Sequence, residues 1–373
     1  MHTAHGLPLP LTLSNLVIQP SGPSLSVQVP HGQCVALLGI GPNLQDFTPL
    51  ARTLAGHTPA QSGQIFVNGQ NVTTVPVGQR KLGLLSPHSP LFSHLSVTHN
   101  ILFPLKAEGG LSQAAMTYRT AEILALMGLD AVRNATPATL NAEQTFRAQL
   151  ARLLVVRPSA VVLETPFTGM DHSSTMRLIT LLEKLQRAIG LSTLLLTHNR
   201  TEALLLGEQL GIMQNGALLQ LGSPATLLQR PTSEAVATAF GEANALTGKV
   251  LYLEDDCAEL RLPSGEVVEA MAAAGLEEND LATICIAPDR LSVMFPRTAP
   301  TESAEPGMLV CSLVSARHIG TSIHLRFRLH DGTEILAHRP PVHLPKELEP
   351  GRLALLAWQA GSATAFPMDQ KSG

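Results

Sequence analysis

Aromatic side chains and lysines are scarce in this sequence. Phe, Trp and Tyr together make up 3% of its 373 residues, and six lysines stand against 19 arginines. The formal net charge is −4, which gives no electrostatic footprint for nucleic acid, so we expect no nucleic-acid partner. The four cysteines form no C-x-x-C pair, and the sequence therefore indicates neither a zinc site nor a framework of disulfides.

Long apolar runs are also missing. No stretch approaches the roughly 18–20 apolar residues that a membrane-spanning helix needs. The first residues, MHTAHGLPLPLTLSN, lack the basic start and the unbroken apolar stretch of a signal peptide. Apolar residues still make up 45% of the chain, which is enough for substantial cores. We therefore expect a soluble protein of two domains, which could dock on a membrane protein.

The first part of the chain, residues 1–240, alternates between short apolar strands and amphipathic helices. The expected strands lie within residues 11–36, 64–72, 161–164 and 192–198, and the turn Asn68-Gly69 makes residues 64–72 a hairpin. The expected helices span residues 111–129, 142–156 and 176–190. Strands that alternate with helices predict an α/β fold built on a parallel sheet.

The second part, residues 241–373, has a different character. It consists of short strands such as GKVLYLE and IHLRFRLH, separated by the hairpin signals Leu-Pro-Ser-Gly and His-Asp-Gly-Thr. We therefore expect an all-β domain there.

One segment of the first domain has the layout of a phosphate-binding loop but lacks its charge. The stretch LLGIGPNLQDFTPLARTLAG (37–56) joins an apolar strand to a helix through a glycine-bearing loop, where a P-loop reads G-x-x-x-x-G-K-[S/T]. Counting from Gly39 places Gln45 at the lysine position. No lysine precedes Lys81. The segment is therefore either a P-loop without its cation or an ordinary connection.

The start of the helix after this loop has its own signals. Thr48 followed by Pro49 predicts a helix N-cap and first helical residue. A helix N-terminus attracts anions weakly, whereas the carboxylate of Asp46 would repel phosphate. The residues thus leave open a weak residual phosphate site.

The order of segments along the chain resembles that of the ATP-binding subunits of ABC importers with a C-terminal TOBE domain. The segments that carry the resemblance are QSGQIFVNGQNVT, PLFSHLSVTHNILFPL (90–105), LNAEQTFRAQLARLLVVRPSAVVLETPFTGMD (140–171), LLLTHN (194–199) and LGIMQNGALLQLGSPATLLQRP (210–231). The junction GEANALTGKV is similar to that of the polyamine, iron and sulfate importer groups, with polyamine as our first choice.

The resemblance implies a P-loop NTPase fold of the ABC ATPase type over residues 1–240, with a helical subdomain near residues 88–155. It implies an OB-like TOBE barrel over residues 241–373. The cofactors that it implies are ATP and Mg²⁺.

The resemblance also assigns site positions to this chain. ATP would contact the positions of Gly39, Gly41, Gln45, Thr48, Gln144 and Asp171. Glu164 would hold the magnesium ion, and His198 stands at the switch-histidine position. Thr165 stands where the family has its catalytic glutamate, and its hydroxyl cannot act as that base at neutral pH.

Several family motifs are altered here. The P-loop segment is two residues longer, so that counting back from the helix puts Phe47 at the lysine position. The signature LSGGQ reads LNAEQ, and its Glu143 would face phosphate with like charge. Pro87 replaces the glutamine that senses metal and γ-phosphate. We interpret the site as the remnant of a nucleotide site, with ATP binding and hydrolysis impaired or lost.

Two other functions remain open from the sequence. The chain could be a working ATPase with a non-standard P-loop that energises uptake of a polyamine, iron or sulfate. It could also be a non-enzymatic regulatory or scaffold protein on the same fold. In the importer interpretation its partners are integral-membrane permease subunits and a second ATPase subunit, in a homodimer or heterodimer. Its location would be cytoplasmic, peripheral on the inner face of the bacterial membrane.

Overall fold

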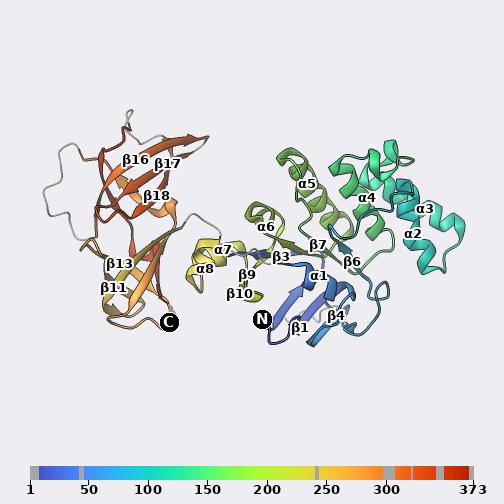
Figure 1. Ribbon diagram of the computed structural model, residues 1–373, viewed down its shortest axis with the longest axis horizontal. Coiled ribbons are helices and arrows are strands. Elements are labelled where there is room, and N and C mark those ends of the chain that lie inside the picture. The colour runs from blue at the N-terminus through green and yellow to red at the C-terminus, as the bar shows by residue number, and fades with distance from the viewer. Residues whose placement is uncertain are drawn as a thin grey trace. The chain divides into compact units, whose positions relative to one another are not determined.

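The computed structural model describes residues 8–41, 46–239, 243–296, 307–320, 322–341 and 348–368. The chain separates into two compact units, Met1–Thr226 and Leu227–Gly373. The expected domain boundary, between residues 240 and 241, lies outside the described residues. Figure 1 shows an α/β first unit and a β-rich second unit, as the sequence predicts.

The centre of the first unit is a six-stranded sheet. In spatial order its strands are β10 (Ala217–Gly222), β9 (Gln209–Gln214), β3 (Cys34–Gly39), β8 (Thr193–Thr197), β7 (Ala160–Glu164) and β6 (Leu82–Leu85). All neighbouring pairs are parallel except β9 with β10. Every residue of β3, β7 and β8 is buried, which is typical of parallel strands covered on both faces.

A smaller antiparallel sheet faces the first one across helix α1 (Thr48–Ala55). Its strands, in spatial order, are β2 (Leu25–Val29), β1 (Leu11–Val17), β4 (Ser62–Val67) and β5 (Gln70–Asn71). Leu50, Ala51 and Leu54 of α1 share one apolar core with residues of both sheets. The Asn68-Gly69 turn joins β4 to β5 with both residues at positive φ, which confirms the hairpin that the sequence predicts.

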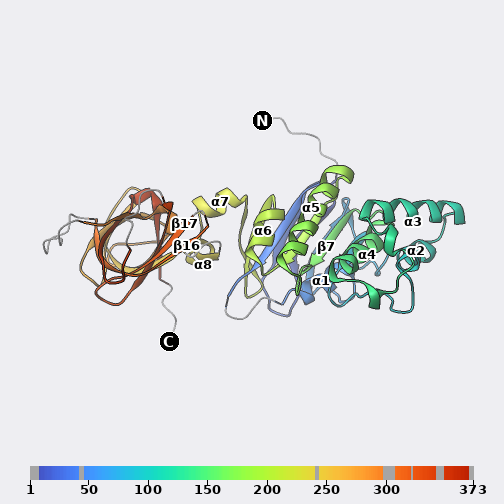
Figure 2. The same ribbon diagram turned by 90° about the horizontal axis from the view of Figure 1, so that it is seen from above.

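The remaining helices of the first unit begin at side-chain caps. They are α2 (Val97–Glu108), α3 (Gln113–Met127), α4 (Ala142–Leu154), α5 (His172–Ile189) and α6 (Arg200–Leu206). Ser96, Ser112, Asn141, Asp171 and Asn199 cap their respective N-termini. Helices α2, α3 and α4 contact one another and lie together in both ribbon views (Figures 1 and 2), which confirms the helical subdomain.

The second unit contains a closed barrel and a separate sheet. The barrel consists of β11 (Asn244–Glu254), β12 (Cys257–Arg261), β13 (Val267–Ala272), β20 (Ala363–Pro367) and β14 (Leu281–Ile286). The five-stranded sheet, in spatial order, is β15 (Ser292–Met294), β19 (Leu353–Ala357), β16 (Leu309–Ile319), β17 (Ser322–Arg328) and β18 (Glu334–Arg339). The sequence predicts the β-rich character, but it does not reveal this second sheet. Two short helices, α7 (Pro224–Gln229) and α8 (Glu234–Ala239), were not expected either.

Within the described ranges, every helix is too short or too polar to cross a lipid bilayer.

A buried arginine fastens the end of α1 to the loop that follows β5. The guanidinium of Arg80, which is 5% exposed, donates to the carbonyl oxygens of Thr53 and Leu54 at 2.8 and 2.9 Å. It also donates to the carbonyls of Thr73 and Val75 at 2.8 and 2.7 Å. The Leu54 carbonyl is one that the end of α1 leaves without an intrahelical partner, whereas the Thr53 carbonyl also accepts from the N–H of Gly56 at 3.1 Å. Arg80 therefore stabilises the element that carries the candidate site.

We expect Arg80→Met to lower the free energy of unfolding of the first unit by on the order of 3 kcal/mol, because it strands several buried carbonyls. The helical circular-dichroism signal during urea unfolding reports this unit. Arg187→Met, at an exposed position on α5, is the matched control and should change stability by less than about 0.5 kcal/mol. Equal effects of the two substitutions would contradict the fastening role of Arg80.

Candidate functional site

The candidate site lies at one edge of the six-stranded sheet. Strands β3, β7 and β8 are parallel neighbours, so their carboxyl ends meet at the same edge. Gly39, Glu164 and Thr197 are the last residues of these strands, and His198 follows directly. In open parallel sheets this edge is where ligands bind.

An aromatic ring occupies the start of α1 at this edge. Phe47 is 2% exposed, and its ring stacks on the imidazole of His198 with centroids 5.0 Å apart and planes inclined by 29°. The Nδ1 atom of His198 lies 3.4 Å from the carbonyl oxygen of Gly39. The ring of Phe47 is thus packed between α1 and the end of β8. Gln45, the other candidate for the lysine position, lies outside the described residues.

Helix α1 begins one residue earlier than an N-cap at Thr48 would place it. Phe47 is the N-cap residue and has no side-chain cap, so Thr48 is already helical and the expected cap is wrong. The physical reason is that both the N–H and the hydroxyl of Thr48 have other hydrogen-bond partners, so the side chain does not cap the helix. The carboxylate of Asp46 accepts from the backbone N–H of Thr48 at 2.9 Å, while the Thr48 hydroxyl is used elsewhere.

Thr48, which is half-buried, and the buried Glu164 form a polar pair. The Thr48 hydroxyl donates to Oε1 of Glu164 at 2.7 Å, and Glu164 is 4% exposed. The second carboxylate oxygen, Oε2, is buried and has no hydrogen-bond partner among the described residues. A buried carboxylate oxygen without a partner carries a large desolvation cost, which a bound cation would offset. A hydroxyl and a carboxylate are also the hard oxygen ligands that Mg²⁺ prefers.

Thr165 adopts an unusual backbone conformation immediately after β7. Its φ is 40°, a left-handed value that is rare for a β-branched residue and costs on the order of 1–3 kcal/mol. Its N–H donates to the carbonyl of Leu196 at 2.8 Å, and its own carbonyl accepts from the N–H and hydroxyl of Thr168. The strand end is therefore held firmly, although the side chain at this position offers no general base.

Gln144, at the kept position of the signature segment, has a local structural role. Its N–H donates to Oδ1 of Asn141 at 2.8 Å, and the N–H of Asn141 donates back to Oε1 of Gln144 at 3.1 Å. This reciprocal pair is a capping box at the start of α4. The side-chain oxygens of Asn141 and Gln144 are thereby engaged within the chain.

The charge of Glu143, which the resemblance places opposite a phosphate, is compensated within the chain. Its carboxylate accepts from Arg147 on α4 at 2.8 Å and from Arg177 on α5 at 2.8 Å. Burial raises the pKa of Glu143, but the bonds from Arg177 and Arg147 outweigh it and hold the pKa below its ordinary value. Glu143 therefore ties the two helices together.

Asp171, the remaining acidic site candidate, caps α5. Its carboxylate accepts from the hydroxyl and the N–H of Ser174, at 2.6 and 2.9 Å, and these bonds hold its pKa below the ordinary value. The guanidinium of Arg177 in turn donates to the Ser174 hydroxyl at 2.9 Å. Asp171 and Glu143 are thus joined through Arg177, a residue that no local sequence pattern singles out because it meets Glu143 across two helices.

The predicted site residues therefore fall into two groups. Gly39, Thr48, Glu164 and His198 come together at the sheet edge around Phe47. Gln144 and Asp171 instead serve as helix caps, as described above. Gly41 follows β3 with φ of 111°, a value suited to glycine, near the side chain of Gln214.

The fit to ATP and Mg²⁺ differs between the two halves of the site. Thr48 and Glu164 fit a magnesium ion, as their oxygen chemistry and the buried Oε2 atom indicate. The phosphate half does not fit: residues 39–48 contain no lysine or arginine, and Phe47 is buried against His198. A phenyl ring cannot supply the point charge that phosphate oxygens require.

Comparisons with known proteins match this chain along most of its length. The "ABC transporter" family model matches residues 23–168, and the "TOBE domain" model matches residues 284–366. A spermidine/putrescine import ATP-binding protein of Pseudomonas aeruginosa is 29% identical over 330 residues, 88% of this chain and 87% of that protein. Sulfate/thiosulfate import ATP-binding proteins of Caulobacter vibrioides and Nocardia farcinica are 31% and 32% identical, over 69% and 62% of this chain and 76% and 69% of theirs.

We expect Glu143→Gln to lower the free energy of unfolding of the first unit by about 1 kcal/mol at neutral pH, because two charge-assisted bonds weaken at a partly exposed site. A carboxylate whose folded pKa is depressed stabilises the fold above its unfolded pKa and loses that contribution as pH falls. The difference from the unaltered chain should therefore shrink below about pH 4.5, the ordinary pKa of glutamate.

The helical circular-dichroism signal in urea, recorded at several pH values, measures this difference. Glu122→Gln on the exposed face of α3 is the control and should show neither effect. A difference for Glu143→Gln that stays constant from neutral to acid pH would exclude the charge pairing as its cause.

Proposed function

We propose that this chain, which belongs to the ABC transporter family of import ATP-binding proteins with a TOBE domain, acts as an importer subunit whose own nucleotide site does not turn over ATP. The observation that carries the proposal is the buried stack of Phe47 on His198. Because α1 begins at Thr48, the residue directly before it corresponds to the lysine position counted from the helix.

Two further changes act in the same direction. Thr165 stands at the position of the catalytic glutamate, and a positioned general base is typically worth about 10²–10⁴-fold in rate. The signature segment, which in the family approaches the nucleotide of the opposite subunit through glycine amides, here begins a capped helix and carries Glu143. Donors aimed at a developing charge are worth about 10²–10³-fold each, although such factors are not additive.

One observation favours the alternative of a working ATPase with a non-standard loop. The Thr48 hydroxyl and the Glu164 carboxylate keep the metal half of the site, and the buried Oε2 atom has no partner among the described residues. Bound Mg²⁺ would supply charge near a nucleotide, and Thr48 and Glu164 would hold that ion. The non-enzymatic scaffold remains the second alternative, and it shares the inert site with our main proposal.

The substrate and partners of the importer are proposed from the relatives. The similar proteins are named for import of spermidine/putrescine and of sulfate/thiosulfate, so we propose a solute of one of these two kinds. The chain would bind integral-membrane permease subunits at the inner face of a bacterial membrane, as a homodimer or with another ATP-binding subunit. In a mixed dimer, one site would still lack the lysine and the glutamate, and the other would place the partner's intact P-loop opposite Asn141, Ala142 and Glu143 of this chain.

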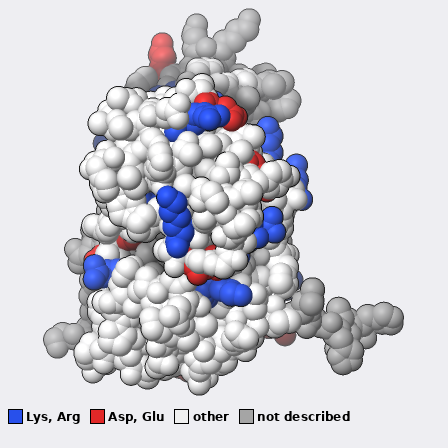
Figure 3. Space-filling model, turned by 90° about the vertical axis from the view of Figure 1, so that its right-hand side faces the viewer, with Lys and Arg blue, Asp and Glu red and all other residues white. Residues whose placement is uncertain are grey.

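An exposed aromatic pair in the helical subdomain is the proposed permease-docking surface. Phe92 and Phe103 are 36% and 47% exposed, and their ring centroids lie 4.7 Å apart. By contrast, Leu91 and Val97 are buried and belong to the core. On the side of the molecule where α2 and α3 lie, charged side chains are scattered and uncharged residues form most of the surface (Figure 3).

The loop that presents Phe92 is held by a fully buried asparagine. Asn100 accepts from the N–H of Phe92 at 2.7 Å and donates to the carbonyls of Phe92, Leu95 and Ser96, each at 3.1 Å. The guanidinium of Arg152 lies 5.5 Å from the centre of the Phe92 ring. Because the hydrogen bonds of Asn100 fix this loop, Phe92 is held in a defined position, as an interface anchor requires.

We expect the purified chain to release phosphate from MgATP no faster than background and to give no saturable calorimetric signal in the micromolar range. Loss of one charge-assisted bond alone weakens binding by about 10–100-fold. Phe47→Lys should not restore turnover, because the base and the signature glycines remain absent. Phe47→Leu keeps the position apolar and controls for the lost ring packing.

Micromolar MgATP affinity, or phosphate release that disappears with His198→Ala, would overturn the inert site and support the non-standard ATPase. Co-purification with a permease in the absence of turnover would support the main proposal.

We expect Phe92→Asp to weaken the complex with the cognate permease by at least about 10-fold, because it places a charge in an apolar anchor position. Tyr118→Asp is the matched control: it lies on α3 of the same subdomain, is 71% exposed, and should leave the complex intact. The measurement is co-purification from membranes, with the circular-dichroism spectrum confirming the fold. An intact complex with folded Phe92→Asp would exclude this surface.

A further inference from the structure

In the second unit, a short region without strand pairing separates the ladder of β14 with β20 from the ladder of β15 with β19. The ladder of β14 with β20 ends at the pair Ile286 and Ala363, and the ladder of β15 with β19 begins at Ser292 and Ala357. Between these pairs the two connections, 287–291 and 358–362, contain the 3₁₀ turns η3 (Pro288–Arg290) and η5 (Ala360–Ser362) instead of strand. The chain therefore opens a space at the passage from the barrel to the five-stranded sheet.

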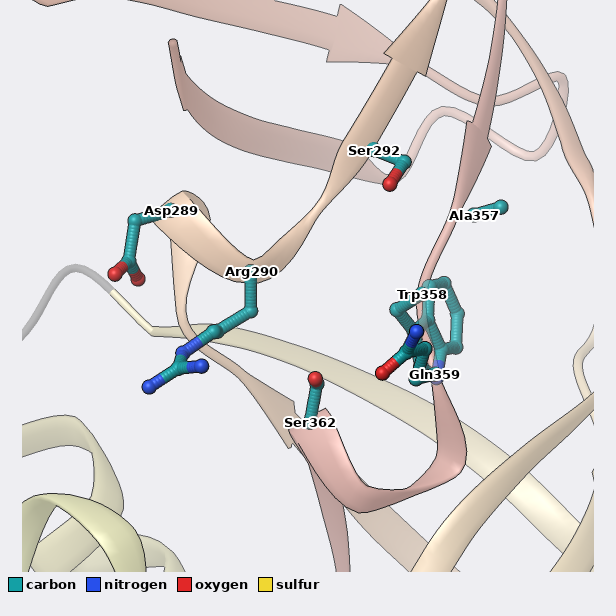
Figure 4. Close-up of a pocket in the computed structure, with 7 residues that line it drawn as sticks. All are labelled: Asp289, Arg290, Ser292, Ala357, Trp358, Gln359 and Ser362. Carbon is teal, nitrogen blue, oxygen red and sulfur yellow. The ribbon is translucent and has the colours of Figure 1, made fainter.

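This space is a pocket of about 350 Å³, within the roughly 300–1,000 Å³ that small-molecule sites occupy. Its lining residues, drawn in Figure 4, are Asp289, Arg290, Ser292, Ala357, Trp358, Gln359 and Ser362. Most of them carry polar side chains, and they come from both connections.

The lining offers several hydrogen-bond donors and one aromatic face. In the part of the chain that the structure describes, the side chains of Arg290, Gln359 and Ser362 have no hydrogen-bond or ion-pair partner. The indole N–H of Trp358 donates to the carbonyl of Glu269 at 2.9 Å, so its position is fixed and only its ring remains available to a ligand. Figure 4 shows the Ser362 hydroxyl between Arg290 and Gln359, and the Trp358 ring beside Gln359.

The only carboxylate in the lining is turned away from these donors. In Figure 4 Asp289 lies on the far side of Arg290 from Ser362, Gln359 and Trp358. The guanidinium is a fork of N–H donors that matches carboxylate or phosphate oxygens, and hydroxyl and amide groups can complete such a site. The lining thus combines one cation and neutral donors with an aromatic surface.

We propose that this pocket binds a small organic anion. Its carboxylate or phosphate group would be held by Arg290, Ser362 and Gln359, and its carbon skeleton would lie on the ring of Trp358. This site belongs to the second unit alone, so it stands independently of whether the first unit hydrolyses ATP.

The test uses the full chain and its single tryptophan, since Trp358 lines the pocket and reports on it directly. Fluorescence titrations with citrate, with inorganic phosphate and with a phosphorylated sugar, each against sodium chloride of equal ionic strength, distinguish the two anionic groups and the need for a carbon skeleton. Putrescine serves as the cationic probe. We expect a saturable change with an organic anion and none with chloride or putrescine.

Arg290→Gln should weaken that binding by at least about 10-fold, because it removes the charge and the fork of donors. Asp289→Asn is the matched control on the neighbouring residue and should change the affinity by less than about 2-fold. Both positions are exposed, and circular dichroism confirms that the variants fold.

No saturable change with any of the anions, or an affinity that Arg290→Gln leaves unaltered, would overturn the proposal. Saturable binding of putrescine that Asp289→Asn abolishes would overturn it as well, since the site would then take cations.

Discussion

The packing of helix α1 between two sheets determines what the candidate site contains. Leu50, Ala51 and Leu54 are buried against both sheets, and Phe47 belongs to the same apolar core. Residues three and four apart share one face of a helix, so the residue just before α1 lies on the buried face whatever its chemistry. A lysine there would run its carbon stem along this face and place its charge at the sheet edge. The phenyl ring instead extends the apolar core up to His198.

Most polar side chains at the predicted site positions, both at the sheet edge and at the start of α4, have hydrogen-bond or ion-pair partners within the chain. The Thr48 hydroxyl bonds to Glu164, the two polar signature side chains cap their own helix, and Glu143 is neutralised by two arginines. Among these side chains, in the part of the chain that the structure describes, the Oε2 atom of Glu164 is the buried oxygen that has no hydrogen-bond partner.

Much of the fold could be predicted from the sequence, because its signals are local. The hairpin turn at Asn68-Gly69, the glycine that ends α5 and the alternation of buried strands with amphipathic helices all lie within short segments. The partners of the site residues could not be predicted in the same way. Glu143 meets Arg177, and Thr48 meets Glu164, across elements that are 34 and 116 residues apart. The second sheet of the second unit was missed because short strands with turns do not reveal how many sheets they form.

The closure of the barrel sets the order in which the chain can fold during synthesis. Strand β11 begins at Asn244, yet the barrel closes only when β20, Ala363–Pro367, pairs with β13 and β14. Every strand of both sheets in the first unit, by contrast, has been synthesised once residue 222 has been added. The first unit can therefore complete its core on the ribosome, as domains commonly do in N-to-C order. In the β-rich unit, strand edges of the barrel stay unpaired while more than a hundred further residues are synthesised. Closure of this barrel also depends on contacts between residues far apart in the sequence, which form slowly.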